Sequence, residues 1–205
     1  MQHGRPQQFA ADLPPDGLMT KDKRKTFEGW IFLALFCLTI PAANWMIGNV
    51  GTVCPRNEPC VIPVAPGLLA PSGVLMVGAA LVLRDLVQRR LGVAYGVGAI
   101  LIGAGLSAAL APAALVVASA VAFLLSELAD FAVYTPLARR RLVAAVAASS
   151  IAGLVVDSIV FLYLAFGSLD FLAGQIVGKL WMVLIALPLI AYLRRRDERL
   201  GLTPA

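Results

Sequence analysis

Histidine is almost absent from this chain, and charged side chains are scarce. The 205 residues include one histidine and only 14% charged residues, against about a quarter in soluble proteins. The single histidine, His3, lies in a polar amino-terminal segment, so a serine–histidine hydrolase is disfavoured. Glu127 and Asp130 are too sparse a pair of carboxylates for an enzyme with paired metal ions. We therefore expect no enzyme, no metal and no cofactor.

Apolar residues are abundant and arranged in long runs. Hydrophobic residues make up 60% of the chain. A helix needs about 20 mainly apolar residues to cross the ~30 Å hydrocarbon core of a bilayer. Runs of roughly this length occupy residues 30–47, 67–83, 93–111, 113–137, 142–166 and 171–193. The sequence therefore predicts an all-α polytopic membrane protein with six transmembrane helices.

Polar segments flank this membrane domain. Residues 1–26 combine scattered Pro, Gly and Gln with basic residues, which predicts a disordered arm. Residues 27–196 form the predicted membrane domain, and residues 197–205 a tail. No cleavable signal peptide is expected, because the first apolar run lacks a small-residue cleavage pattern directly after it.

The basic residues follow a positive-inside pattern. They cluster before the first run, after the second, between the fourth and fifth, and after the last, whereas the opposite loops carry only Arg56. An excess of Lys and Arg in short loops marks the cytoplasmic side. The sequence predicts that both termini are cytoplasmic. The net charge of +5 then reflects topology and contact with anionic lipids rather than binding to nucleic acid.

The longest predicted external loop, residues 48–66, contains Cys54 and Cys60. Thiols outside the cytoplasm can oxidise to a disulfide, and the sequence leaves both the paired and the reduced state open. A zinc site is disfavoured, because only two thiols are available and His3 lies on the opposite side of the membrane.

Asp157 and Lys179 are ionisable residues inside predicted spans. Charge at the bilayer centre costs at least about 3 kcal/mol, so such residues usually face the protein interior and act there. At ~1.5 Å of rise per residue, both lie about 12–14 Å below the predicted outer face. We expect an ion pair, which is either part of a transport site or a structural link between two helices. Gln175, one turn before Lys179, would line the same cavity.

Glu127 and Asp130 are spaced i and i+3, so they share one face of a helix. Two such carboxylates repel when both are ionised, and one then tends to hold a proton. A proton relay, or recognition of substrate N–H groups, would use this pair; Asp130 could instead pair with Arg84. Arg84 and Asp85 lie at the end of the second run and are most simply interpreted as interfacial charges that snorkel to the surface.

The order and spacing of several motifs over residues 30–196 form a recognisable pattern. The motifs are Arg84-Asp85-Leu86 with Arg89 and Gly92; Ser149-Ser150 with Gly153, Asp157-Ser158, Phe161 and Ala165-Phe166; Lys179 with Pro188; Asn44 before Trp45; and Asp130 with Leu137. Together they resemble the bacterial queuosine precursor transporter family, also called the vitamin uptake transporter family. Leu154 and Glu127 replace Asn and Gln of some members, a departure that concerns the substrate more than the fold.

The resemblance implies a transporter of the bacterial inner membrane. It would import 7-cyano-7-deazaguanine or a related small heterocycle through a central polar cavity by alternating access. The candidate substrate-binding or transport residues are Asn44, Asp85, Glu127, Asp130, Asp157, Gln175 and Lys179. Carboxylates would accept the N–H groups of the substrate, and Trp45, Tyr134 or Phe161 would stack on its ring. Proton-coupled and facilitated transport both stay open.

The nearest alternative is the substrate-binding S subunit of an energy-coupling-factor vitamin importer. Such a subunit also has six spans, but it would need an ATPase module and a coupling membrane partner. A homodimer is compatible with the small-residue faces of residues 67–83 and 93–111, although these faces could equally pack internally.

Overall fold

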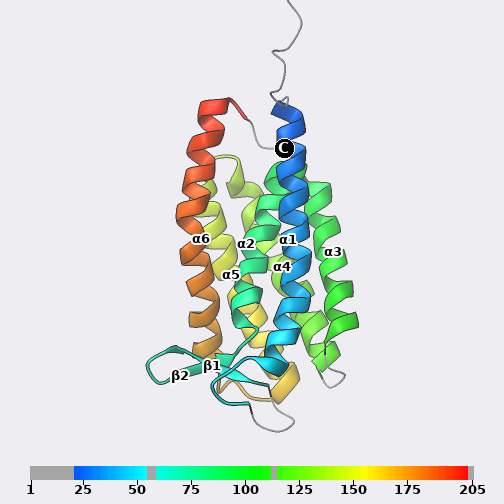
Figure 1. Cartoon of the computed structure of the whole chain (residues 1–205), viewed down its shortest axis with the longest axis vertical. Helices are drawn as coiled ribbons and strands as arrows, with labels where there is room; N and C mark the ends of the chain where they lie inside the picture. The colour runs from blue at the N-terminus through cyan, green and yellow to red at the C-terminus, as the bar shows by residue number, and fades with distance from the viewer. Residues whose placement is uncertain (1–20, 55–58, 112–114, 203–205) are drawn as a thin grey trace, which may run out of the picture.

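The computed structural model describes residues 21–54, 59–111 and 115–202, and these residues form a bundle of six helices (Figure 1). The helices are α1 (Lys21–Asn49), α2 (Val74–Leu91), α3 (Val93–Leu110), α4 (Val116–Ala138), α5 (Leu142–Phe166) and α6 (Leu172–Leu200). Within the described residues, five of them, all except α2, are long and apolar enough to cross a membrane. The prediction of an all-α polytopic membrane protein is confirmed at this level, and a sixth span stays a prediction.

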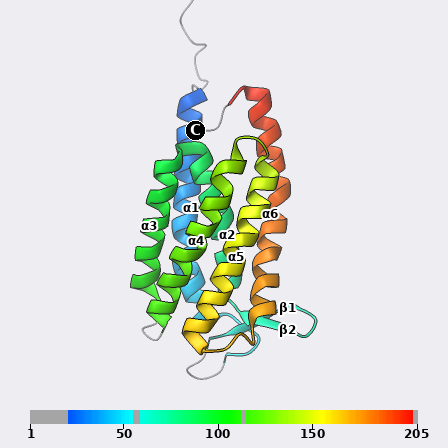
Figure 2. The same ribbon diagram turned by 180° about the vertical axis from the view of Figure 1, so that it is seen from behind.

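Helix α2 differs from the others because its last eight residues carry four charges. Arg84, Asp85, Arg89 and Arg90 are nevertheless all buried. The reason is the position of the helix, which contacts each of the other five. Figures 1 and 2 show it enclosed between helices in front and behind. Protein side chains rather than lipid therefore surround these charges.

A β-hairpin precedes α2 and corrects the predicted second span. Strands β1 (Val61–Ala65) and β2 (Leu68–Pro71) pair antiparallel, so residues 67–73 are not helical and α2 begins only at Val74. Gly67 has φ +74° in the turn, a conformation that glycine adopts without a Cβ clash. Proline and β-branched residues in this segment disfavour a helix interior and are tolerated in a short edge strand.

Helices α1 and α6 extend beyond the predicted membrane domain. Residues 21–26, assigned above to the disordered arm, are helical, and α6 continues to Leu200 through residues assigned to the tail. Ion pairs at i,i+4 spacing, Arg24–Glu28 and Arg194–Glu198, support these extensions. The rest of the predicted arm, with His3, and Arg56 lie outside the described residues.

The two ends of the bundle differ in composition. The first turn of α1, the last turn of α6 and the α2–α3 and α4–α5 connections meet at one end, which we call the basic end (Figures 1 and 2). The hairpin lies at the other, the hairpin end. At the basic end, Arg90 binds Asp197 through both terminal nitrogens, at 2.8 and 2.9 Å, and Glu28 at 3.0 Å. This basic-end network, which also includes Arg89 and Arg196, joins α1, α2 and α6.

Two apolar clusters form the core, and both include residues of α2. One contains Leu81, Tyr134 and Leu154, and the other contains Phe36, Val87 and Phe123. Large apolar side chains are also exposed on the outer faces of the helices. An exposed apolar surface of this extent marks contact with a membrane or with another protein.

Candidate functional site

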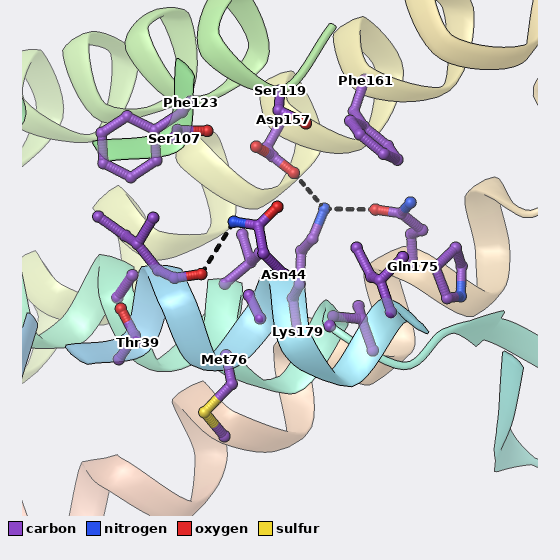
Figure 3. A pocket seen from close by; sticks show the side chains of 18 residues that line it. Thr39, Asn44, Met76, Ser107, Ser119, Phe123, Asp157, Phe161, Gln175 and Lys179 are labelled. Carbon is purple, nitrogen blue, oxygen red and sulfur yellow. Dashed lines mark hydrogen bonds and ion pairs between the residues drawn. The ribbon is translucent and has the colours of Figure 1, made fainter. Parts of the chain in front are cut away.

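A cavity of about 80 Å³ lies inside the bundle toward the hairpin end. A single water needs about 10–15 Å³, so the cavity has room for several. All six helices contribute to its wall, and Pro71 of β2 and Gly73 bound it at the hairpin end. Its polar lining consists of Thr39, Asn44, Ser107, Ser119, Asp157, Gln175 and Lys179 (Figure 3).

Lys179 is the centre of the polar lining. Its Nζ lies 2.5 Å from Asp157 Oδ2, 2.6 Å from Gln175 Oε1 and 2.8 Å from Ser158 Oγ. An ammonium group has three donors, and each of them has an acceptor here. The predicted ion pair between α5 and α6 is therefore present, with Gln175 beside it. Lys179 is only 1% exposed, so the pair is shielded from bulk solvent.

The sequence of α2 lets this pair sit deep in the bundle. A Cβ at Gly78 would lie 2.7 Å from the backbone carbonyl oxygen of Lys179. Glycine at this position allows the backbones of α2 and α6 to approach closely, as small residues do between membrane helices. The backbone of Lys179 therefore lies against α2, and its Nζ reaches Asp157 of α5.

Asn44 and two aromatic rings complete the lining. Asn44 Nδ2 donates a hydrogen bond of 2.9 Å to the Ile40 carbonyl of its own helix. Figure 3 shows Asp157, Lys179 and Asn44 between Phe123 on one side and Phe161 on the other. Of the three aromatic residues predicted to stack on a substrate, only Phe161 lines this cavity. Trp45 is 60% exposed, and Tyr134 packs elsewhere.

A second buried group, the Arg84 cluster, lies closer to the basic end. We define it as Arg84 with Asp85, Glu127 and Asp130. The Arg84 Nη1 nitrogen lies 2.9 Å from Asp85 Oδ1, Nε lies 3.1 Å from Glu127 Oε2, and Nη2 binds Asp130 Oδ1. All four side chains are at most 1% exposed. The interpretation of Arg84 and Asp85 as snorkelling interfacial charges is wrong, because α2 lies inside the bundle.

Neutral groups surround the Arg84 cluster. Gln88 Oε1 accepts from Arg84 Nη1 at 3.1 Å, and Ser149 Oγ donates to Asp85 Oδ2 at 3.0 Å. The rings of Phe131 and Tyr134 each lie 5.6 Å from Arg84 Cζ, close enough for cation–π attraction. Groups of α2 and α4 thus hold the guanidinium, and Ser149 of α5 binds one of its carboxyl partners.

The structure divides the predicted site residues into two groups. Asn44, Asp157, Gln175 and Lys179 line the cavity, whereas Asp85, Glu127 and Asp130 do not and belong to the Arg84 cluster. Sequence reasoning missed the cavity residues Thr39, Ser107, Ser119 and Phe123, and it missed Arg84 as a common partner of three carboxyl groups. Arg84 lies eleven residues into α2 rather than in its last turn, and only the structure shows this, because the predicted span ended at residue 83.

The hairpin end is closed by covalent and polar links. Cys54 and Cys60 form a disulfide with a Cα–Cα distance of 4.1 Å. The backbone N–H of Cys60 donates to the Ile47 carbonyl, and Trp181 Nε1 donates to the Val64 carbonyl at 3.0 Å. These links attach the hairpin to α1 and α6 beside the cavity. No group of three or more His, Cys, Asp or Glu side chains in the described ranges is arranged to hold a metal.

Fold and site together describe a polytopic membrane protein with a cavity inside the bundle that includes a buried ion pair in its lining, an arrangement that fits a transporter. A family model described as "Putative vitamin uptake transporter" matches residues 106–193, from the end of α3 into α6. The match supports assignment of the chain to the vitamin uptake transporter family, and it confirms the family resemblance. No curated protein and no solved structure matches.

The matched segment includes most of the buried polar residues. It contains both acidic residues of α4, the Asp157–Lys179 pair and Gln175, whereas Asn44, Arg84 and Asp85 precede it. The family assignment therefore covers the α5–α6 half of the cavity directly. The contribution of α1 and α2 to the site comes from the structure.

Proposed function

We propose that this chain imports a small polar heterocycle through the cavity by alternating access. The observation that carries the proposal is the buried Lys179–Asp157–Gln175 group beside Phe161 on a cavity wall, inside a membrane protein. The proposal places the chain in the bacterial inner membrane with the basic end and both termini in the cytoplasm. The arginines gathered at the basic end support this orientation.

The chemistry of the cavity suggests how the substrate is recognised. Lys179 and Asp157 now satisfy one another, and removing either partner from a buried pair costs about 3–5 kcal/mol. A substrate can separate them only if it offers both a donor for Asp157 and an acceptor for Lys179. An edge with adjacent N–H and carbonyl groups does this while the ring stays neutral. Phe161 and Phe123 would contact the faces of such a ring.

A neutral ring with adjacent donor and acceptor groups is found in 7-cyano-7-deazaguanine, which is therefore the substrate to test. Its guanine-like edge has N–H donors next to a carbonyl acceptor, and its nitrile is a further acceptor for Asn44 or Gln175. A charged vitamin would instead add an unpaired charge to a neutral pair, which is unfavourable in a buried site. The proposed substrate is therefore neutral and both a donor and an acceptor.

The contacts at the two ends of the bundle suggest which parts would move in an alternating-access cycle. Pro71 of the hairpin and the adjoining Gly73 line the cavity at one end, and the basic-end network ties α1, α2 and α6 at the other. In the proposed cycle the hairpin end opens to admit the substrate, and the basic-end ion pairs separate to release it. Separation of these buried ion pairs would have to be offset, in part by the water that solvates the charges once the basic end opens.

The test is uptake of labelled 7-cyano-7-deazaguanine into bacteria that lack their own synthesis and uptake of it. Wild type should accumulate the label, and Asp157→Asn and Lys179→Ala should reduce uptake about tenfold or more, since a hydrogen bond to a charged group contributes about 1.5–3 kcal/mol. Asp170→Asn is the matched control, because Asp170 is exposed in the α5–α6 connection. Normal uptake by both cavity variants would contradict the proposed site.

The S-subunit alternative predicts a different result with purified protein. Liposomes that contain only this chain should take up the substrate if it is a transporter by itself. Uptake that requires an added ATPase module and coupling protein would favour the alternative. Absence of uptake in wild-type cells with normal amounts of inserted protein would exclude this substrate.

A further inference from the structure

The Arg84 cluster is not neutral if all of its groups are ionised. One guanidinium faces three carboxyl groups, so the formal charge is −2 at a place where every side chain is at most 1% exposed. Transfer of a carboxylate from water into a protein interior costs several kcal/mol unless it is compensated. Protonation of a carboxyl group removes that cost, so this cluster favours bound protons.

The charged and titratable groups that face the cluster do not neutralise its excess negative charge. On α2, Arg89 and Arg90 are bound to Asp197 and Glu28 in the basic-end network. On α6, Lys179 binds Asp157 of α5, and Asp157 adds negative charge facing Glu127. On α4, the Tyr134 hydroxyl has no hydrogen-bond partner among the described residues.

The hydrogen bonds point to where one proton lies. Arg84 donates to Glu127 and Asp130, and Ser149 donates to Asp85 Oδ2. By contrast, Asp130 Oδ2 has no hydrogen-bond partner in the part of the chain that the structure describes, and neither has Asp85 Oδ1, whose short distance to Arg84 lacks hydrogen-bond geometry. The two carboxyl groups contact the two terminal nitrogens of the same guanidinium, Asp85 at Nη1 and Asp130 at Nη2, so they lie next to each other. A carboxylic acid has one O–H donor, so a single proton between them would link Asp85 to Asp130.

We propose that Asp85 and Asp130 share a proton in this conformation and that the Arg84 cluster couples substrate import to the movement of that proton. The coupling rests on the transport activity proposed above, whereas the shared proton does not. In the transport step the carboxyl O–H bond breaks, the proton passes to water at the opened basic end, and the carboxylate left behind stays beside Arg84. No electron is transferred, and the proton is replaced from the hairpin side in the next cycle.

Helix α5 provides the physical connection between the cluster and the cavity. Ser149, Gly153 and Asp157 follow one another at intervals of four residues and are all buried, so they share one face of α5. Ser149 binds Asp85, and Asp157 binds Lys179 about 12 Å farther along the axis, at ~1.5 Å per residue. When a substrate draws Asp157 away from Lys179, a shift of this face changes the contact of Ser149 with Asp85.

Helices α2 and α4 connect the same two places. Ala80 of α2 lines the cavity one turn before Arg84, and Phe123 of α4 lines it one turn before Glu127. Opening or filling the cavity would therefore move the helices that hold the cation and all three of its carboxyl partners. This shared framework separates the proposed coupling from a purely structural role of the cluster.

The first experiment detects the proton without any substrate. Infrared difference spectra of the full chain in lipid nanodiscs, with ¹³C-labelled aspartate, report a protonated aspartate through its isotope-shifted carboxylic-acid band. Wild type should show the band at neutral pH, and Asp85→Asn and Asp130→Asn should each lose it. Asp170→Asn should keep it. Absence of the band in wild type, or its persistence in both cluster variants, would overturn the shared proton.

The second experiment measures coupling in liposomes that contain the full chain and 7-cyano-7-deazaguanine. One proton per substrate supports about tenfold accumulation for a gradient of one pH unit, acidic outside, since one pH unit and a tenfold ratio are equal in free energy. Asp130→Asn should lose this accumulation but keep exchange of internal for external substrate. Wild-type accumulation that does not respond to the gradient would overturn the coupling. Neither accumulation nor exchange in wild type, with the infrared band present, would instead contradict the proposed function.

Discussion

The two buried ionic groups differ in balance and in surroundings. Lys179 and Asp157 form a neutral pair on the cavity wall, whereas Arg84 faces three carboxyl groups and none of these four residues lines that cavity. A neutral pair beside a cavity can exchange partners with a neutral solute without a change in charge. An unbalanced cluster away from that cavity would respond to transport through protons or helix movement. This difference is the reason why we propose recognition for one group and proton binding for the other.

The same comparison explains why both groups have a glutamine neighbour. Gln175 accepts from Lys179 at 2.6 Å, and Gln88 accepts from Arg84 at 3.1 Å, each at i,i+4 spacing on its own helix. A neutral acceptor satisfies one N–H of a buried cation without adding charge. In the proposed transport cycle, each cation would therefore keep a hydrogen-bond partner on its own helix while its contacts with carboxylates change.

Removal of the cation from the unbalanced cluster should have the largest effect. Arg84→Gln leaves three buried carboxyl groups without a cation, and we expect a loss of about 5 kcal/mol in unfolding free energy, the upper end for a broken buried pair. Arg84→Lys should recover part of it, because lysine restores the charge but not the planar fork. Unfolding in mixed detergent micelles measures both. If Arg84→Gln lost less unfolding free energy than Lys179→Ala, charge imbalance would not determine how strongly each buried group depends on its cation.

Breaking the neutral pair should cost less stability but abolish uptake. Lys179→Ala leaves Asp157 without its cation, with an expected loss of about 3 kcal/mol. The double change Asp157→Ala with Lys179→Ala should regain stability, because no buried charge is left unpaired, while uptake stays absent. Parallel unfolding and uptake measurements test this. Recovery of uptake in the double variant would show that the pair is only structural.

A smaller effect is expected from the basic-end network. Asp197→Asn weakens the ion pairs with Arg89 and Arg90, and we expect a loss of about 2 kcal/mol, as for hydrogen bonds to charged groups. Glu198→Gln is the matched control: its pair with Arg194 is exposed and should contribute well below about 1 kcal/mol. Equal losses in the two variants would contradict a special role of the buried network in joining α1, α2 and α6.

The smallest effect should come from Glu127→Gln. In the wild type, Arg84 Nε donates to Glu127 Oε2 at 3.1 Å, and the amide oxygen of glutamine can accept the same hydrogen bond. The substitution also removes one unit of negative charge from the cluster. We expect a change of less than about 1 kcal/mol, in either direction, in unfolding free energy. Gradient-driven accumulation should persist, in contrast to Asp130→Asn. Loss of accumulation in Glu127→Gln would move the coupling proton from the aspartates to Glu127.

Much of the candidate site could be predicted from the sequence, because it depends on the spacing of residues within single helices. The rise per residue of a helix gave Asp157 and Lys179 the same depth, and the structure joins them. The i,i+4 spacing also placed Gln175 on the same wall. The division between the cavity and the Arg84 cluster could not be predicted in this way. Asp130 and Asp157 both lie in apolar runs, and they differ in the neighbouring helix that each one contacts, α2 for Asp130 and α6 for Asp157.

The sequence by itself determined where most of the helices lie, that Asp157 and Lys179 lie at a similar depth, and where the basic residues gather. These features depend on composition and helix geometry along one segment. Only the tertiary structure decided that α2 is central, that Arg84 and Asp85 are buried rather than interfacial, and that residues 61–71 form a hairpin across the cavity end. These features depend on which helices pack together. Such packing follows from close contacts such as that of Gly78 with α6, which involve residues far apart in the chain.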